Sequence, residues 1–297
     1  MNITLTGASG FIGKLLVQRL QAEGHQLHLL GRSQPSYANV TFTKWDALSN
    51  SQPPEEALAN ADAVIHLAGE PVGQRWSDEV KRNIRDSRIN GTNRLVEALA
   101  KHPPKTLVAA SAIGFYGDRG DEILTEASRP GSGFLPGVCV DWEQAAQAAT
   151  ALGTRVVNPR IGIVLGLGGG AIDQMLPIFR LGGGGHIGNG RQWMSWIHVE
   201  DLVALLCAAL TDEKYKGPIN GTSPNPVTNS EFTAALGHVL HRPAIIPVPT
   251  FGLKLMFGEM AEMLIGGQHV VPEAALKAGF SFRYPQLDAA LQAIIKG

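Results

Sequence analysis

Two apolar periods alternate along the first half of the chain. Short runs rich in valine, isoleucine and leucine predict buried strands, and apolar residues that recur every three or four positions predict helices. The predicted strands cover residues 2–6, 26–30, 63–68 and 106–111, with two more ending before Lys44 and starting at Arg155. Since helix-period segments separate these runs, the pattern predicts a parallel sheet with helices on both faces.

Two long helices are expected within this alternation. The first covers about residues 77–101, because Ser77 is a favourable N-cap, acidic residues follow it, and Pro103-Pro104 ends it. The second covers about residues 136–152 and follows a loop over residues 114–133.

The pattern changes after Arg160. Glycine-rich runs at 166–170 and 182–185 predict mobile segments, and prolines accumulate beyond residue 218. Thr228-Asn-Ser-Glu231 has the form of a capping box, and residues 272–279 predict a short helix with proline at its first position.

Together these features predict a doubly wound α/β fold with a smaller α+β cap. We assign residues 1–160 and 193–215 to a dinucleotide-binding domain, and residues 161–192 and 216–297 to a cap over the carboxyl edge of the sheet.

A glycine turn joins the first predicted strand to the first helix. Gly7 permits a tight turn, Gly10 lets the backbone approach a pyrophosphate, and Gly13 lets the helix lie close to the sheet. An ordinary glycine-rich turn is the alternative, but the complete strand–helix–strand unit favours dinucleotide binding. The predicted contacts of this turn are Gly7, Ser9, Gly10, Phe11, Ile12 and Gly13.

The end of the second strand indicates which coenzyme is bound. NAD sites place an acidic residue there for the ribose diol. This chain reads Gly31-Arg32-Ser33 instead, and a guanidinium can pair with a 2′-phosphate. We therefore predict NADP(H); a surface arginine without a ligand is the alternative.

Composition excludes several classes of function. The chain has 297 residues, a net charge of −1 and 44% hydrophobic residues, which favours a globular protein without bulk attraction to nucleic acid or anionic membrane. The two cysteines, Cys139 and Cys207, are expected to be core residues in a reducing compartment, and no metal-ligand spacing involves them. The first strand begins at Met1 and the apolar stretch 202–210 is too short to span a bilayer, so a cytoplasmic location is expected.

The Gly-x-x-Gly-x-x-Gly spacing resembles the extended short-chain dehydrogenase/reductase superfamily. Residues 111–117, 158–166 and 196–202 resemble later strand ends and signatures of that superfamily. The most similar group is an atypical, epimerase-like subfamily of the NAD-dependent epimerase/dehydratase superfamily, whose distinct C-terminal segment resembles residues 267–288.

This resemblance implies further coenzyme contacts. Asp46 would meet the adenine edge, and the turn Leu67-Ala68-Gly69 would lie beside the phosphates and ribose. His66 precedes this turn and is interpreted as a satisfied core histidine without a chemical role. The remaining expected contacts are Asn83 and Arg88 of the long helix, and Arg160. Because family members often dimerise through two long helices, the resemblance also implies a homodimer whose candidate contacts are the helices near residues 77–101 and 136–152.

The chemistry of the superfamily depends on a Tyr-x-x-x-Lys pair, which this chain lacks. By register, Gly137 takes the tyrosine position and Asp141 the lysine position, while the usual serine falls on Ala112. Tyr116 and Ser111 are the substitute catalytic candidates, because both lie near the end of the fifth predicted strand. An aromatic pocket wall is the alternative role of Tyr116.

Three functions remain open from the sequence. The first is an NADP-dependent oxidoreductase or epimerase-like enzyme acting on a small molecule, with Trp193 and Trp196 lining a cleft. The second is a module that holds NADP(H) without turnover. The third is a sugar-nucleotide binder, with a second pyrophosphate held by Arg160, Arg180 and Arg191.

Overall fold

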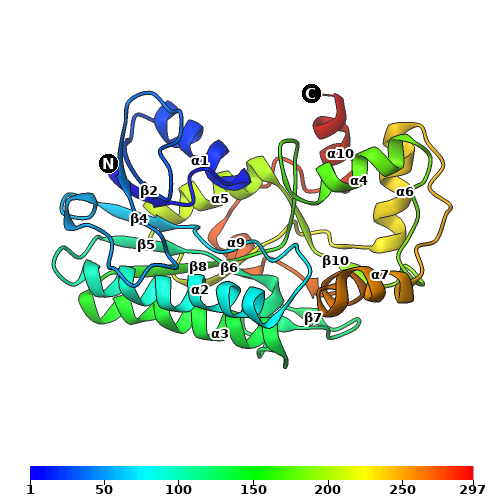
Figure 1. Ribbon diagram of the computed structural model, residues 1–297. Coiled ribbons are helices and arrows are strands. Elements are labelled where there is room, and N and C mark those ends of the chain that lie inside the picture. The colour runs from blue at the N-terminus through cyan, green and yellow to red at the C-terminus, as the bar shows by residue number, and fades with distance from the viewer. Residues whose placement is uncertain (297) are drawn as a thin grey trace.

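The main sheet is parallel and has the strand order β12-β8-β5-β4-β1-β2-β3 (Figure 1). The structure is a computed structural model and describes residues 1–296. A short strand, β6 (Ser111–Ala112), pairs with β8 beyond the end of β5. The other strands of the sheet are β1 (Asn2–Thr6), β2 (Gln26–Gly31), β3 (Val40–Lys44), β4 (Ala63–His66), β5 (Thr106–Ala109), β8 (Arg155–Ile161) and β12 (Gly217–Gly221).

Helices cover both faces of this sheet, which confirms the predicted doubly wound fold. One face packs against α1 (Phe11–Ala22) and α5 (Val199–Thr211), through side chains such as Leu16, Leu20 and Leu206. The other face packs against α2 (Asp78–Leu99) and α3 (Phe134–Gln147). The short helices η1 (Glu55–Ala57), η2 (Ile113–Tyr116) and η3 (Ala148–Leu152) lie in the connections.

The second unit has a core of its own. Trp196, Phe232 and Leu291 are buried together between its helices and short strands. Its helices are α4 (Gly170–Arg180), α6 (Asn229–Leu240) and α10 (Leu287–Lys296), and its strand pairs are β9 (Ile163–Leu165) with β11 (Trp196–His198) and β10 (Trp193–Met194) with β13 (Val227–Thr228). The predicted capping box at Thr228 and Glu231 starts α6.

The segment over residues 250–278 crosses between the units. It contains α7 (Thr250–Phe257), η4 (Gly258–Ala261), α8 (Glu262–Ile265), β14 (His269–Val270) and α9 (Glu273–Ala278). β14 pairs with β7 (Ile123–Leu124), and Ala275 of α9 is buried in the core beneath the main sheet. Pro272 is the N-cap of α9 and not its first residue.

Two sequence predictions differ from this architecture. The predicted cap includes residues 216–297, yet β12 is an edge strand of the main sheet, because its backbone pairs with β8. Trp196 was expected to line a cleft, but it is fully buried in the second core.

Both cysteines are free; Cys139 is buried and Cys207 half-buried, and burial raises the pKa of each thiol to about 12.

No helix among residues 1–296 combines the length and apolarity needed to cross a membrane.

Two glycines in helix interiors provide a matched test of close packing. A Cβ on Gly91 of α2 would lie 2.9 Å from both the Cβ and the carbonyl oxygen of Ala47, whereas a Cβ on Gly137 of α3 would meet nothing within 4 Å. Gly137→Ala should stabilise the protein by roughly 0.5–1 kcal/mol through helix propensity. Gly91→Ala should destabilise it by about 1 kcal/mol or more, because the Ala47 backbone must move. Urea unfolding measures both; equal effects would contradict the packing of α2 on Ala47.

Candidate functional site

The turn between β1 and α1 brings three glycines into contact. Gly7 has a φ of +79°, and a Cβ at this position would lie 2.9 Å from the Leu67 carbonyl carbon. A Cβ on Gly13 would lie 2.1 Å from the Gly7 carbonyl oxygen, so only glycine lets α1 approach the turn this closely. Direct backbone contacts therefore require glycine at two of the three positions, Gly7 and Gly13.

The N-terminus of α1 presents unpaired backbone donors. The first helical hydrogen bond runs from the Lys14 N–H to the Gly10 carbonyl, 2.9 Å, which leaves the N–H groups of Phe11, Ile12 and Gly13 without an acceptor in the helix. Within the described chain, no side chain caps α1 and its first turn has no acidic residue. Free N–H groups and the helix dipole make this end an anion site.

A cavity of about 250 Å³ opens beside this helix end. It lies at the carboxyl ends of β1, β2 and β4, where open α/β sheets bind ligands. Of the predicted coenzyme contacts, the cavity is lined by Gly7, Ser9, Gly10, Arg32, Asp46, Leu67, Ala68 and Gly69. The cavity lining does not include Phe11, Ile12, Gly13, Asn83, Arg88 or Arg160.

Sequence reasoning missed several lining residues. Ser33, Pro35, Phe42 and Ser87 also line the cavity, and the Tyr37 hydroxyl donates to the Ala8 carbonyl at 3.0 Å. Ser87 follows Ile84 and precedes Gly91 at helical spacing, so the inner face of α2 was a signal that could have found it.

Arg32 and Asp46 lie on the same cavity but differ in their bonding. The Asp46 carboxylate accepts a hydrogen bond from the Leu48 N–H at 3.0 Å, which holds the turn after β3. Arg32 is exposed and forms no ion pair with any residue of the range 1–296. Its guanidinium is therefore available to a ligand anion.

Arg88 contacts the turn after β4 and does not line the cavity. Its guanidinium donates to the carbonyls of Glu70 at 2.9 Å and Ile84 at 3.1 Å, and it lies 5.0 Å from the Trp142 ring centroid. A Cβ on Gly69 would come within 3.1 Å of the guanidinium carbon. Arg88 thus positions the Gly69 turn, and burial lowers its pKa. Asn83 is half-buried on the same helix.

The Phe11 ring packs against the glycine run 166–170. A Cβ on Gly169 would lie 2.7 Å from Phe11 Cβ, and one on Gly166 would lie 2.9 Å from the tip of the ring. This run was expected to be mobile; in the structure its glycines make room for an aromatic ring at the start of α1. The run therefore connects the second unit to the helix end that presents the free N–H groups.

A buried polar chain lies beneath the cavity. His66 is fully buried; its Nδ1 lies 2.7 Å from the Thr6 hydroxyl and its Nε2 3.1 Å from the Thr92 hydroxyl. Thr6 also accepts from the Ala68 N–H, and Thr92 accepts from the Trp142 indole. A neutral imidazole can donate at one nitrogen and accept at the other. Burial lowers the pKa of His66 to about 4.

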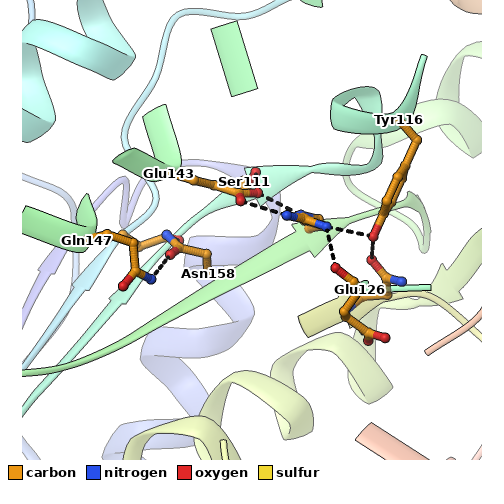
Figure 2. A network of polar contacts seen from close by, with 9 residues as sticks. Ser111, Tyr116, Glu126, Glu143, Gln147 and Asn158 are labelled. Carbon is orange, nitrogen blue, oxygen red and sulfur yellow. Dashed lines mark hydrogen bonds and ion pairs between the residues drawn. The ribbon is translucent and has the colours of Figure 1, made fainter. Parts of the chain in front are cut away.

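The catalytic candidates lie in a second network, shown in Figure 2. Ser111 and Asn220 both pair with Arg160 across adjacent strands, which places three polar side chains on one row of the sheet. The Arg160 guanidinium forms a bidentate pair with the Glu143 carboxylate, 2.8 Å for each bond. All three side chains are buried, and α3 and η2 both pack against β8.

Each catalytic candidate donates its proton inside this network. The Ser111 hydroxyl donates to Glu143 at 2.6 Å, and the Tyr116 hydroxyl donates to the Asn220 side-chain oxygen at 2.6 Å while accepting from Arg160 at 2.9 Å. Tyr116 is fully buried, and this burial raises its pKa. A satisfied, buried phenol does not face open space, so the assignment of Tyr116 and Ser111 as catalysts stays a prediction.

The same network places Arg160 away from a ligand. Its side chain is 4% exposed and its charge is paired with Glu143, so its predicted contact with coenzyme or a second pyrophosphate is not seen in this geometry. Sequence reasoning missed Glu143 as its partner. No sequence signal indicated this pair, because Glu143 on α3 and Arg160 on β8 meet only in the folded chain.

The two positions that replace the Tyr-x-x-x-Lys pair, Gly137 and Asp141, lie at the surface. A Cβ on Gly137 would meet nothing within 4 Å, and the Asp141 carboxylate lies 3.3 Å from the Arg85 guanidinium. Among residues 1–296, no cluster of three or more histidine, cysteine or acidic side chains could hold a metal ion.

His66 generates a prediction on stability and pH. Because its folded pKa of about 4 lies below the unfolded value of about 6.5, the unfolded state binds the proton first as pH falls. The contribution of neutral His66 to the free energy of unfolding is therefore fully present above pH 6.5. It falls by about 3 kcal/mol as the pH is lowered to 4. His66→Gln should remove this part of the acid dependence in urea unfolding, whereas His238→Gln at an exposed position should retain it. An unchanged slope in His66→Gln would contradict the neutral buried imidazole.

Profiles of known families match most of the chain. The NAD dependent epimerase/dehydratase family matches residues 3–220, and a domain of unknown function, DUF1731, matches residues 248–294. The chain is 43% identical over 304 residues to the epimerase family protein SDR39U1 homolog, chloroplastic, of Arabidopsis thaliana, covering 100% of this chain and 87% of that protein.

Solved structures agree with this match. The human epimerase family protein SDR39U1, crystallised with NADPH, is 36% identical and superposes with a TM-score of 0.89 over 100% of both chains. The UDP-glucose 4-epimerase of Thermotoga maritima, solved with UDP-glucose, has a TM-score of 0.80 over 100% of this chain and 98% of that one. At 18% identity it is similar in fold alone. This chain belongs to the NAD dependent epimerase/dehydratase family.

Proposed function

We propose that this chain binds NADP(H) at the amino end of α1 and uses it to reduce a small carbonyl compound. The observation that carries the proposal is the set of three free N–H groups at Phe11, Ile12 and Gly13, beside a cavity whose lining includes Arg32. A diphosphate fits these donors, and the closely packed glycines Gly7 and Gly13 leave room for it. The human relative crystallised with NADPH supports the same coenzyme.

The residues of this chain would hold the coenzyme and select its phosphate. The helix end would bind the diphosphate, and Arg32 would pair with the 2′-phosphate of the adenosine ribose. The turn 67–69, held by Arg88 and by the Thr6–His66 bond, would lie along the coenzyme. A bound reduced coenzyme would supply a hydride to a carbonyl carbon, while the carbonyl oxygen takes a proton from water.

A second candidate is a module that holds NADP(H) without turnover. The hydrogen bonds of Tyr116 and Ser111 favour it, because both hydroxyl protons are donated to buried acceptors. The third candidate, a sugar-nucleotide binder, receives less support. Its proposed arginine at position 160 is already paired with Glu143.

Arg32→Asp tests the choice of coenzyme. Loss of the guanidinium and gain of a carboxylate should weaken NADPH by about tenfold to hundredfold and shift preference toward NADH, since a charged hydrogen bond contributes roughly 1.5–3 kcal/mol. The measurement is the dissociation constant of each coenzyme by fluorescence titration. Arg75→Asp, another exposed arginine that is outside the cavity lining, is the matched control. If the ratio of the NADPH and NADH dissociation constants is unchanged in Arg32→Asp, Arg32 does not pair with the 2′-phosphate.

Tyr116→Phe tests the buried hydrogen-bond network, and the wild-type chain separates the reductase from the binding module. The change removes one hydroxyl and leaves Arg160 and Asn220 short of a partner, so a loss of about 1–3 kcal/mol in unfolding free energy is expected. NADPH affinity should stay within about twofold, because Tyr116 does not line the cavity. NADPH oxidation is then followed with a panel of ketones and aldehydes. Turnover in the wild type supports the reductase; coenzyme binding without turnover over the whole panel supports the module.

A further inference from the structure

The connection between β2 and β3 is short and has no helix. Parallel strands are normally joined by a crossover of a dozen or more residues, which usually contains a helix. Here only residues 32–39, which we call the strap, join the two parallel strands, and the strap contains neither helix nor strand. Arg32, Ser33 and Pro35 of the strap line the coenzyme cavity. The expected partner of the 2′-phosphate therefore stands on a segment that has no secondary structure of its own.

Few bonds hold the backbone of the strap. Within the described chain, it forms one hydrogen bond to another backbone group, from the Tyr37 N–H to the Pro35 carbonyl at 3.0 Å, and this bond is internal. Two side-chain bonds join the strap to the rest of the molecule. The Tyr37 hydroxyl donates to the Ala8 carbonyl at 3.0 Å, and the Gln21 amide of α1 donates to the Ala38 carbonyl at 2.7 Å. These two bonds tie the strap to the glycine turn and to α1.

The surroundings of Tyr37 favour its bond to Ala8. Its half-buried ring packs against the core on the α1 side of the main sheet. Burial raises the pKa of the phenol, so the hydroxyl keeps the proton that it donates. The acceptor, Ala8, is itself buried and lines the cavity together with Gly7 and Ser9. One hydrogen bond thus joins the glycine turn, where the diphosphate is expected, to the strap.

Arg32 depends on the strap for its direction. Its side chain is exposed and forms no ion pair or hydrogen bond with any residue of the range 1–296. The end of β2 fixes where the Arg32 Cα lies, and the course of the strap then decides where the guanidinium points. A coenzyme with two anionic groups needs both binding sites at one spacing, and a segment that is already held does not have to be ordered on binding.

We propose that Tyr37 is a positioning residue for NADPH, whose bond to Ala8 holds the strap so that Arg32 and Ser33 face the 2′-phosphate of the bound coenzyme. The inference rests on the coenzyme binding proposed above and deepens it, because it adds a residue that selects NADPH without touching it. Tyr37 does not line the cavity and acts through the strap. NADH has no 2′-phosphate and gains little from a correctly directed guanidinium. Tyr37 therefore changes the ratio of the two affinities.

The test is a double-mutant cycle on the full chain, with Tyr37→Phe, Arg32→Ala and the combined variant. Fluorescence titration gives the dissociation constants of NADPH and NADH. Tyr37→Phe should weaken NADPH about threefold to tenfold, the range of one neutral hydrogen bond, and leave NADH within about twofold. In the Arg32→Ala background, the same change should alter NADPH affinity by less than about twofold, because a residue that acts through Arg32 loses its effect when Arg32 is absent.

Two further variants control for unrelated effects of the substitution. Tyr284→Phe removes the same atom from a tyrosine that is outside the cavity and whose hydroxyl forms no hydrogen bond within residues 1–296, so both affinities should be kept. Gln21→Met removes the second bond that ties down the strap and should shift the ratio of the two dissociation constants in the same direction as Tyr37→Phe. If a melting curve shows that Tyr37→Phe does not fold, Gln21→Met takes its place in the cycle.

The outcomes separate this inference from the proposed function. If NADPH fails to bind the wild type, the proposed function is lost and the inference with it. If NADPH binds the wild type, three results would each overturn the inference while coenzyme binding stands. They are equal weakening of NADPH and NADH by Tyr37→Phe, no change in either affinity, or the same loss of NADPH affinity with and without Arg32.

Discussion

The close contact between the Gly7 turn and Gly13 of α1 is the constraint on which the site depends. It brings the helix end against the sheet without side chains between them, at a helix end whose first three backbone N–H groups have no acceptor within the helix. Buried groups fix the surrounding turns. The Thr6–His66 pair holds the ends of β1 and β4, Arg88 holds the Gly69 turn, and the Phe11 ring fills the space that the glycine run 166–170 leaves. The anion site is thus preorganised by packing rather than by charged side chains.

The region that the Tyr-x-x-x-Lys pair would occupy differs from the helix end, because its polar groups are side chains that bond to one another. Its polar side chains form a closed row in which Arg160, Glu143 and Tyr116 satisfy one another beneath α3. Removing one partner of such a buried pair costs about 3–5 kcal/mol, because the other charge is left buried and unpaired. Open space lies instead at Gly137, and exposed apolar side chains lie on α7.

Much of the fold could be predicted from the sequence, because the central strands β4 and β5 are short, buried, mainly apolar runs and the helices carry clear capping signals such as Ser77 and Thr228. The family resemblance and the doubly wound fold are confirmed. Long-range pairing could not be predicted, since β12 contains glycine and proline and joins β8 only through its backbone. The Arg160–Glu143 pair was missed for the same reason, because helix and strand meet only after folding. The cytoplasmic location and a homodimer through α2 and α3 stay predictions, and one relative is named chloroplastic.

Calorimetric titration of the purified chain with NADPH tests the central claim most directly. The account predicts one coenzyme per chain, and a binding heat that Gly13→Ala abolishes because its Cβ would lie 2.1 Å from the Gly7 carbonyl oxygen and displace the helix end. A melting curve of the variant establishes that it remains folded. Absence of heat with the wild type at millimolar NADPH, or full affinity in a folded Gly13→Ala protein, would contradict an anion site built from the amides of α1.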